Sequence, residues 1–236
     1  MANALVIAGH IRTFRKIANH LVAFIEKNKL DVYLYIWEEN NLDEIQYVVD
    51  TLKPIKWLAE KNESYNQQFL ESESRVLSAN PKSLITPDNI HAMFSMHFAR
   101  RKVFELIEKE YDNLVFTRFD TFIDPFLIEE MVAKNLDVVI TPENEYYGMI
   151  SDIFAIIPWK YADNYFFYNR AEDIHSRRFS EEFKGWLKTK FWWPNAMNDM
   201  KLHDENRYCP HMLCMRNFFE TNTPYIVTNL PVYLQR

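Results

Sequence analysis

An arginine and two aspartates close the apolar stretch "YDNLVFTRFDTFIDP" at residues 111–125. Arg118 and Asp120 are two residues apart, so in an extended chain their side chains lie on the same face. A carboxylate here can bind Mg²⁺ or Mn²⁺, which take oxygen ligands and complete their shells with water and substrate phosphates. A guanidinium beside it can bind the phosphate. From spacing alone, the alternatives are a local salt bridge or Asp120 capping a turn.

Glycine is too scarce for the common phosphate-binding loops. The chain has 3 glycines among 236 residues and contains neither G-x-G-x-x-G nor G-x-x-x-x-G-K-[ST]. A phosphate bound here must therefore be held by side chains, by a metal or by a helix N-terminus. The net charge of -6 argues against a protein that binds duplex nucleic acid, which would carry a basic stripe.

The first half of the chain alternates strand and helix patterns. Such alternation is typical of βαβ units, and hence of a mostly parallel sheet with helices on both faces. In open sheets of this kind, ligands bind outside the carboxyl ends of the strands, where Arg118 and Asp120 are expected. The predicted strands are 4–9, 31–37 and 55–60, and the predicted helices begin near Thr13 and span about 41–53.

A long helix is predicted to precede the charged strand. The tripeptide "TPD" at 86–88 is typical of a helix start, and apolar residues at helical spacing continue to Tyr111. Arg100 and Arg101 lie on this helix; the alternatives are that one of them faces a phosphate or that they lie on a solvated helix face, and we expect the solvated face. Residues 61–85 are polar without clear periodicity and are predicted to form a surface excursion.

The second half loses the alternation of strands and helices. Further strands are predicted at 136–141 and 152–158, and the remainder is expected to form a helical, aromatic-rich subregion over the edge or mouth of the sheet. Aromatic residues make up 16% of the chain; they can stack on sugar rings, but side chains of this kind more often fill cores. Because no linker or repeat is evident, a single domain over 1–236 is expected.

Several short motifs, taken in order, resemble the nucleotide-sugar-dependent glycosyltransferases of the GT-A fold, whose signature is a D-x-D at the end of a central strand. More narrowly, the chain is similar to small bacterial and viral transferases of surface-polysaccharide synthesis. One position departs from the signature, because Arg118 occupies its first acidic position and leaves only Asp120 as a carboxylate. The motifs are "GHIRTF" (9–14), "DVYLYIW" (31–37), "YDNLVFTRFD" (111–120) and "YYGMISDIFAI" (146–156).

The resemblance implies a GT-A-like α/β fold and assigns roles to the turn after the first strand and to the charged strand end. Nucleotide binding falls to Gly9, His10 and Arg12, with the Arg12 guanidinium on the diphosphate or the base, together with Arg118 and Asp120. Asp120 is then the ligand of a Mn²⁺ or Mg²⁺ cofactor. From the residues alone, Arg12 is equally compatible with a solvated arginine at a helix start.

A transfer that inverts configuration needs a general base for the acceptor hydroxyl. Asp152 is the first candidate, because it begins a predicted apolar strand. The alternative for it is a turn aspartate after Gly148. Glu205, ahead of a helix expected from about 208, is the second candidate for the base.

The predicted function is that of a glycosyltransferase. It would move a sugar from a nucleoside-diphosphate sugar to a glycan or lipid-linked acceptor with the assistance of a divalent cation. Residues 1–125 would form the nucleotide-binding half and residues 126–236 the acceptor-binding half. Two alternatives stay open. The first is a sugar-phosphate nucleotidyltransferase, although such an enzyme normally needs a glycine-rich N-terminal loop. The second is a catalytically silent carbohydrate- or nucleotide-binding protein on the same fold, which would suit the weak metal signature.

Features of membrane insertion and export are missing from the sequence. No apolar run approaches the roughly 20 residues needed to span a bilayer, and "ALVIAG" lacks the basic flank and cleavage site of a signal peptide. The 2 cysteines do not make a disulfide framework. We therefore expect a cytoplasmic protein without a membrane-spanning segment.

Overall fold

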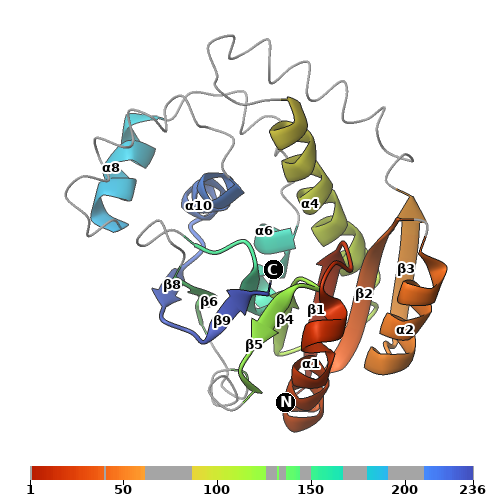
Figure 1. The fold of residues 1–236 in the computed structure, drawn as a ribbon. Helices are drawn as coiled ribbons and strands as arrows, with labels where there is room; N and C mark the ends of the chain where they lie inside the picture. Colours follow the sequence, from red (N-terminus) through yellow and green to blue (C-terminus); the bar gives the residue numbers. More distant parts are fainter. Residues whose placement is uncertain are drawn as a thin grey trace.

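The computed structural model describes residues 2–39, 41–61, 87–125, 132, 137–143, 150–166, 180–190 and 210–235. In these ranges the chain forms a seven-stranded sheet of order β3-β2-β1-β4-β7-β6-β8, and a two-stranded sheet pairs β5 with β9 (Figure 1). The strands are β1 (Asn3–Gly9), β2 (Asp31–Glu38), β3 (Lys56–Lys61), β4 (Asn113–Thr117), β5 (Thr121–Ile123), β6 (Val139–Pro142), β7 (Phe154–Pro158), β8 (Tyr225–Thr228) and β9 (Val232–Leu234).

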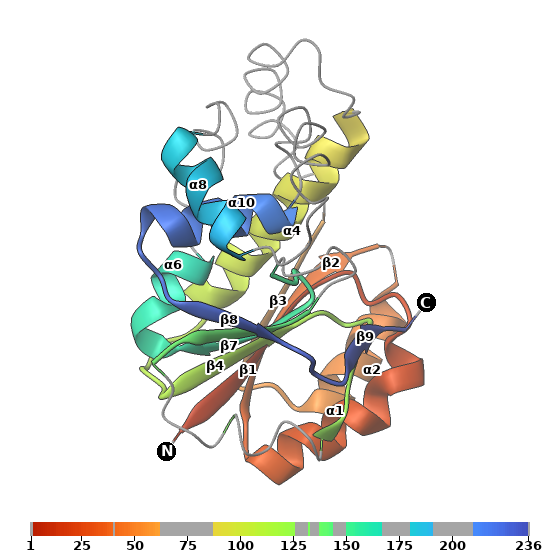
Figure 2. The ribbon, with the colours of Figure 1, turned by 90° about the vertical axis from the view of Figure 1, so that its left-hand side faces the viewer.

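Helices cover both faces of the larger sheet. Figure 2 shows α1 and α2 on one face, and α4, α6, α8 and α10 on the other. The predicted α/β class, with a mostly parallel central sheet flanked by helices, is confirmed. None of the helices in the described part of the chain is long and apolar enough to cross a bilayer. The helices are α1 (Phe14–Asn28), α2 (Leu42–Leu52), α4 (Pro87–Glu105), α6 (Ala162–Phe166), α8 (Glu181–Lys190) and α10 (Pro210–Glu220), with a 3-10 turn, η2, at Trp159–Tyr161.

Strand β7 runs against its neighbours in the larger sheet. β1 pairs in parallel with β2 and β4, β2 with β3, and β6 with β8, whereas β7 is antiparallel to both β4 and β6. The start of β7 therefore lies beside the end of β4, with Phe154 opposite Thr117. This reversal brings the residues before β7, including Asp152, to the carboxyl edge of the parallel strands.

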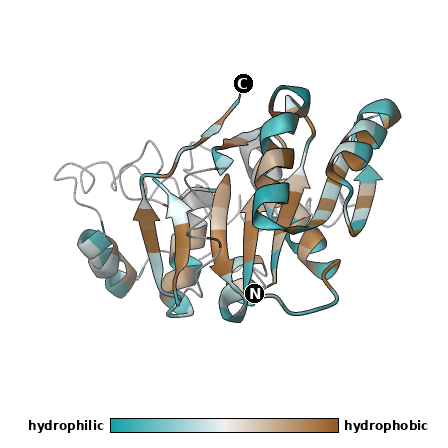
Figure 3. Cartoon of the chain, turned by 90° about the horizontal axis from the view of Figure 1, so that it is seen from below, coloured by the Kyte–Doolittle hydropathy of each residue, from teal (hydrophilic) through white to brown (hydrophobic). Residues whose placement is uncertain are grey.

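Alternating side chains divide the core into two layers. Along β1, Ala4 and Val6 belong to the layer beneath α4, whereas Leu5 and Ile7 belong to the layer beneath α1. Because such a strand is buried on both faces, it is a nearly continuous apolar run, as is typical of parallel sheets. Figure 3 shows this hydrophobic character on the central strands, while the outer helices carry hydrophilic residues beside hydrophobic ones.

The predicted elements of the first half are confirmed as β1, α1, β2, α2 and β3. The long helix is α4, but the prediction that its pattern continues to Tyr111 is wrong, since α4 ends at Glu105. The Tyr111 hydroxyl instead donates to an Asp31 carboxylate oxygen at 2.8 Å and shares a hydrogen bond with Tyr33 at 2.9 Å. These contacts tie the connection before β4 to the amino edge of the sheet.

The second half supplies strands as well as helices. The strands expected at 136–141 and 152–158 are observed as β6 and β7, and β8 extends the same sheet, so both predicted halves build it. Aromatic residues of α6, α8 and α10, such as Phe166, Phe183 and Phe218, are buried in the layer beneath α4. These three aromatic residues fill the core. The surface excursion predicted at 61–85 lies outside the described residues, apart from Lys61.

Candidate functional site

The turn after β1 presents Arg12 at the carboxyl edge of the sheet. Gly9 has a φ of 123° and Arg12 a φ of 46°, a region that side chains rarely adopt. A Cβ at Gly9 would meet no atom within 4 Å, so the backbone conformation, and not space, favours glycine there. Arg12 adopts a left-handed conformation despite its side chain. Such residues are uncommon and cluster at functional sites.

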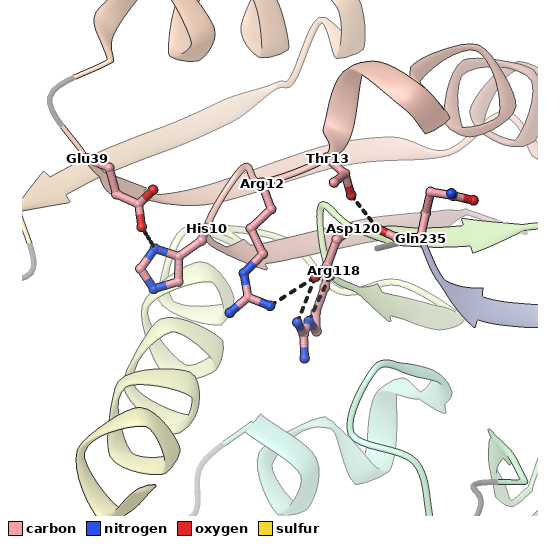
Figure 4. A network of polar contacts seen from close by, with 7 residues as sticks. All are labelled: His10, Arg12, Thr13, Glu39, Arg118, Asp120 and Gln235. Atoms are coloured by element: carbon pink, nitrogen blue, oxygen red, sulfur yellow. Dashed lines mark hydrogen bonds and ion pairs between the residues drawn. The ribbon is translucent and has the colours of Figure 1, made fainter. Parts of the chain in front are cut away.

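Asp120 is the centre of a cluster of charges (Figure 4). Its side chain is 6% exposed. The N–H groups of Arg118 donate from Nε to Oδ1 at 3.0 Å and from Nη2 to Oδ2 at 2.8 Å. The Nη1 group of Arg12 donates to Oδ2 at 3.1 Å. The local salt bridge, one of the alternatives from the spacing, is therefore present, and Arg12 extends it. We call Arg12, Arg118 and Asp120 the arginine cluster.

Strand β9 fixes the backbone of this cluster. The Gln235 N–H donates to the Asp120 carbonyl at 2.8 Å, and the Thr13 hydroxyl donates to the Gln235 carbonyl at 2.5 Å. The antiparallel pairing of β5 with β9 continues these contacts, with Thr121 opposite Leu234. The turn after β1 and the turn after β4 are thus joined through the last described residues of the chain.

His10 lies beside the cluster and contacts Glu39 through Nδ1 (Figure 4). Burial lowers the pKa of His10 below its ordinary value of 6.5, and the positive charges of Arg12 and Arg118 lower the pKa further, whereas Glu39 acts in the opposite direction. The imidazole is therefore neutral near pH 7. The positive charge at this edge comes from the two arginines.

The lowered pKa of His10 predicts a loss of stability in mild acid. As pH falls below about 6.5, the unfolded chain binds the His10 proton before the folded chain does, so the free energy of unfolding decreases. Above that pH both forms are neutral and the effect disappears. Urea unfolding at about pH 7.5 and about pH 5.5 should show a smaller loss for His10→Gln than for the parent. An equal loss in both proteins would exclude this role of His10.

Asp152 lies at the same edge of the sheet, two residues before β7. It is half-buried, and its backbone carbonyl accepts a hydrogen bond from Arg100 Nη2. The Thr117 hydroxyl donates to the next carbonyl, of Ile153, at 3.4 Å. The prediction that Asp152 begins this strand is wrong, because β7 starts at Phe154 and Asp152 lies in the bend before it; the strand itself is anchored to the end of β4. The role of Asp152 as the base stays a prediction. Glu205 lies outside the described residues.

Arg100 is a residue that the sequence analysis placed wrongly. It is 1% exposed, and its guanidinium carbon lies 4.6 Å from the Phe116 ring centroid and 5.2 Å from that of Tyr165. The expected solvated face is correct for its neighbour Arg101, which is exposed and pairs with Glu105 at 3.1 Å. Helical spacing could have predicted the burial of Arg100, because residues four apart lie on the same helix face and Phe104 is buried.

The arginine cluster does not fit a divalent cation. Both Asp120 oxygens accept hydrogen bonds from guanidinium groups, so a cation would compete with these groups and lie beside two like charges. Among the described residues, no group of three His, Cys, Asp or Glu side chains could hold a metal ion. Cation binding at Asp120 stays a prediction from the sequence.

A cavity of about 550 Å³ lies away from the arginine cluster. Its walls include Trp186, Phe219 and Tyr225, and the Lys190 ammonium lies 5.4 Å from the Trp186 ring centroid. Tyr225 is the first residue of β8, which runs in the same direction as β4. The cavity is therefore at the amino edge of the sheet, opposite to Asp120.

Comparison with known proteins does not establish a function for this chain. No family model matches the chain, and no curated protein matches it. Among solved structures, it is similar to mouse xyloside xylosyltransferase 1 in its apo form, with a TM-score of 0.42 and 10% sequence identity, over 96% of this chain and 84% of that chain. A likeness at this TM-score carries no argument about what the present chain does.

Proposed function

We propose that this chain is a glycosyltransferase that moves a sugar from a nucleoside-diphosphate sugar to a glycan or lipid-linked acceptor. The proposal rests on one observation, that Arg12 and Arg118 both donate hydrogen bonds to Asp120 beyond the carboxyl ends of β1 and β4. Ligands of open α/β sheets bind at this edge. Paired guanidinium groups suit the phosphate oxygens of such a ligand, and the order of the sequence motifs supports the same reading.

The reaction makes two demands on the residues at this edge. When the bond between the sugar and the diphosphate breaks, negative charge grows on the departing diphosphate, and Arg12 and Arg118 are placed to stabilise it. In an inverting transfer, a base must accept the proton of the acceptor hydroxyl. Asp152 is our first candidate for this base, because β7 brings it to the same edge, and Glu205 is the second.

The cellular setting belongs to the proposal as well. Cation assistance by Mn²⁺ or Mg²⁺ stays a prediction from the sequence, which the two guanidinium groups at Asp120 do not favour. The sequence resemblance favours surface-polysaccharide synthesis, and the 2 cysteines, which make no disulfide framework, favour the cytoplasm. Residues 1–125 would bind the donor and 126–236 the acceptor.

A screen of donor hydrolysis tests the proposal. Each available nucleotide sugar is incubated with the protein, and the released nucleoside diphosphate is measured with and without Mn²⁺. A glycosyltransferase should hydrolyse at least one donor slowly. A nucleotidyltransferase should instead consume a triphosphate with a sugar phosphate, and a silent binding protein should release nothing although it binds a nucleotide or a sugar. Either of these results would replace the proposed activity.

Replacement of Arg12 by alanine should weaken nucleotide binding. The loss of a charge-assisted contact to the diphosphate is expected to cost about 1.5–3 kcal/mol of binding free energy, measured by isothermal titration with nucleoside diphosphates. Arg15→Ala is the matched control, because Arg15 pairs with Glu44 at 2.7 Å on the surface of α1 and α2. Unchanged affinity in Arg12→Ala would remove Arg12 from the donor site.

A further inference from the structure

Arginine N–H groups take three of the about four lone-pair positions of the Asp120 carboxylate. Its Oδ1 accepts from Arg118 Nε at 3.0 Å, and its Oδ2 accepts from Arg118 Nη2 at 2.8 Å and from Arg12 Nη1 at 3.1 Å. Figure 4 shows these contacts converging on the one side chain. A carboxylate that is to serve as a metal ligand needs an oxygen lone pair directed at the ion. Here both oxygens are directed at guanidinium groups.

The charges of the cluster favour an anion as its ligand. Within the arginine cluster, two guanidinium groups and one carboxylate leave one net positive charge. Outside it, His10 is neutral near pH 7 because burial lowers its pKa, and the Glu39 carboxylate that contacts His10 is 61% exposed, so solvent screens it. Arg12 donates to Asp120 through Nη1, and Arg118 donates through Nε and Nη2. Each guanidinium has five N–H groups, so both retain donors for a phosphate. The Arg12 and Arg118 side chains are 54% and 20% exposed, which gives a ligand access to them.

We propose that Arg12 and Arg118 together bind the diphosphate of the donor through their remaining N–H groups, so that this chain binds it without a divalent cation. The inference rests on the proposed function. In this arrangement Asp120 is a positioning residue that holds the two guanidinium groups side by side. The departure from the D-x-D pattern at Arg118 then has a physical meaning, since an arginine at that position supplies positive charge itself.

The backbone around the cluster supports a fixed arrangement of this kind. The Asp120 carbonyl is held by the Gln235 N–H at 2.8 Å, and the turn that presents Arg12 is held to Gln235 through Thr13. Arg12 keeps a φ of 46°. A donor group held in advance where charge develops stabilises that charge without a cost of rearrangement. The two arginines are therefore set in place before the diphosphate arrives.

Isothermal titration of the full chain tests the inference. Pyrophosphate and the diphosphates of uridine, guanosine, cytidine and adenosine are titrated first with EDTA and then with Mn²⁺. We expect pyrophosphate and at least one nucleotide to bind in EDTA, with a dissociation constant that Mn²⁺ changes by less than about twofold. In EDTA, Arg118→Gln should weaken binding about tenfold to a hundredfold. Arg15→Gln, the matched control on α1, should bind as the parent does.

The possible outcomes separate the inference from the proposed function. Nucleotide binding that requires Mn²⁺, or that Mn²⁺ tightens about tenfold or more, would overturn the inference and leave the glycosyltransferase proposal standing. If neither nucleotide nor pyrophosphate binds in either condition, both are overturned. Unchanged binding by Arg118→Gln would also overturn the inference, and Arg12→Gln repeats this test if Arg118→Gln fails to fold.

Asp120 variants test its positioning role separately. Asp120→Asn should weaken binding in EDTA without making it depend on Mn²⁺, and Asp120→Glu should restore part of the affinity. A metal ligand would give the opposite pattern, in which Asp120→Asn removes a stimulation by Mn²⁺ that the parent shows. Thermal melting of each variant confirms that the folded protein is being titrated.

Discussion

Asp152→Asn is expected to lower the turnover of sugar transfer by about two to four orders of magnitude, the usual contribution of a general base. Asparagine keeps the shape of the side chain but cannot accept the proton of the acceptor hydroxyl. The affinity for the donor should hardly change, because the base contacts the acceptor and not the diphosphate. Steady-state kinetics and donor titration measure these effects.

Asp163→Asn provides the control for this substitution. Asp163 is an exposed aspartate in the first turn of α6, so its replacement should leave turnover unchanged. Near-normal turnover of Asp152→Asn would make Glu205 the better candidate for the base. Loss of donor binding in Asp152→Asn would instead show that Asp152 contacts the sugar or the nucleotide.

Arg100→Ala is expected to reduce the free energy of unfolding by about 3 kcal/mol. The side chain is 1% exposed and packs over the rings of Phe116 and Tyr165, so its removal leaves a cavity. The carbonyl of Asp152 also loses the hydrogen bond from Nη2. Relief of the cost of burying a cation offsets part of these losses. Urea unfolding measures the change in stability.

The neighbouring residue offers a matched control on the same helix. Arg101→Ala removes an exposed side chain whose pair with Glu105 lies on the surface, and such pairs contribute about 0.3–0.5 kcal/mol. Arg100→Met keeps much of the apolar volume and should lose about half as much stability as Arg100→Ala. Equal losses for Arg100→Ala and Arg101→Ala would contradict the buried position of Arg100.

Local patterns were sufficient to predict most elements of the sheet and its helices. The apolar runs of β1 and β2 and the spacing of α1 are properties of neighbouring residues, so they can be recognised in a short window. The antiparallel direction of β7 is different. It depends on which strand lies next to β4, and no pattern within residues 154–158 distinguishes a parallel from an antiparallel neighbour.

The candidate site shows the same division between local and distant information. Arg118 and Asp120 pair within the turn after β4, which the Thr121 N–H closes on the Arg118 carbonyl at 3.3 Å, and not along an extended strand; the salt bridge itself was one of the alternatives that their spacing left open. The contact of Arg12 with Asp120 joins residues 108 apart in the chain. Arg12 could be assigned to the same site only through a resemblance of motifs, because no periodicity connects positions so far apart.

The hydrogen bond from the Thr13 hydroxyl to the Gln235 carbonyl joins residues 222 apart, so it forms late in biosynthesis. The ribosome adds roughly 5–20 residues per second, N-terminal parts first, so β1, β2 and β4 are synthesised well before β9. Closing such a long loop is also entropically costly, which slows the step. Strands β1, β2 and β4 can therefore pair while the turns that carry Arg12 and Asp120 still lack the hydrogen bonds of Gln235. A newly made chain should form these central strands first and acquire its ligand-binding competence only when residues 232–235 have docked.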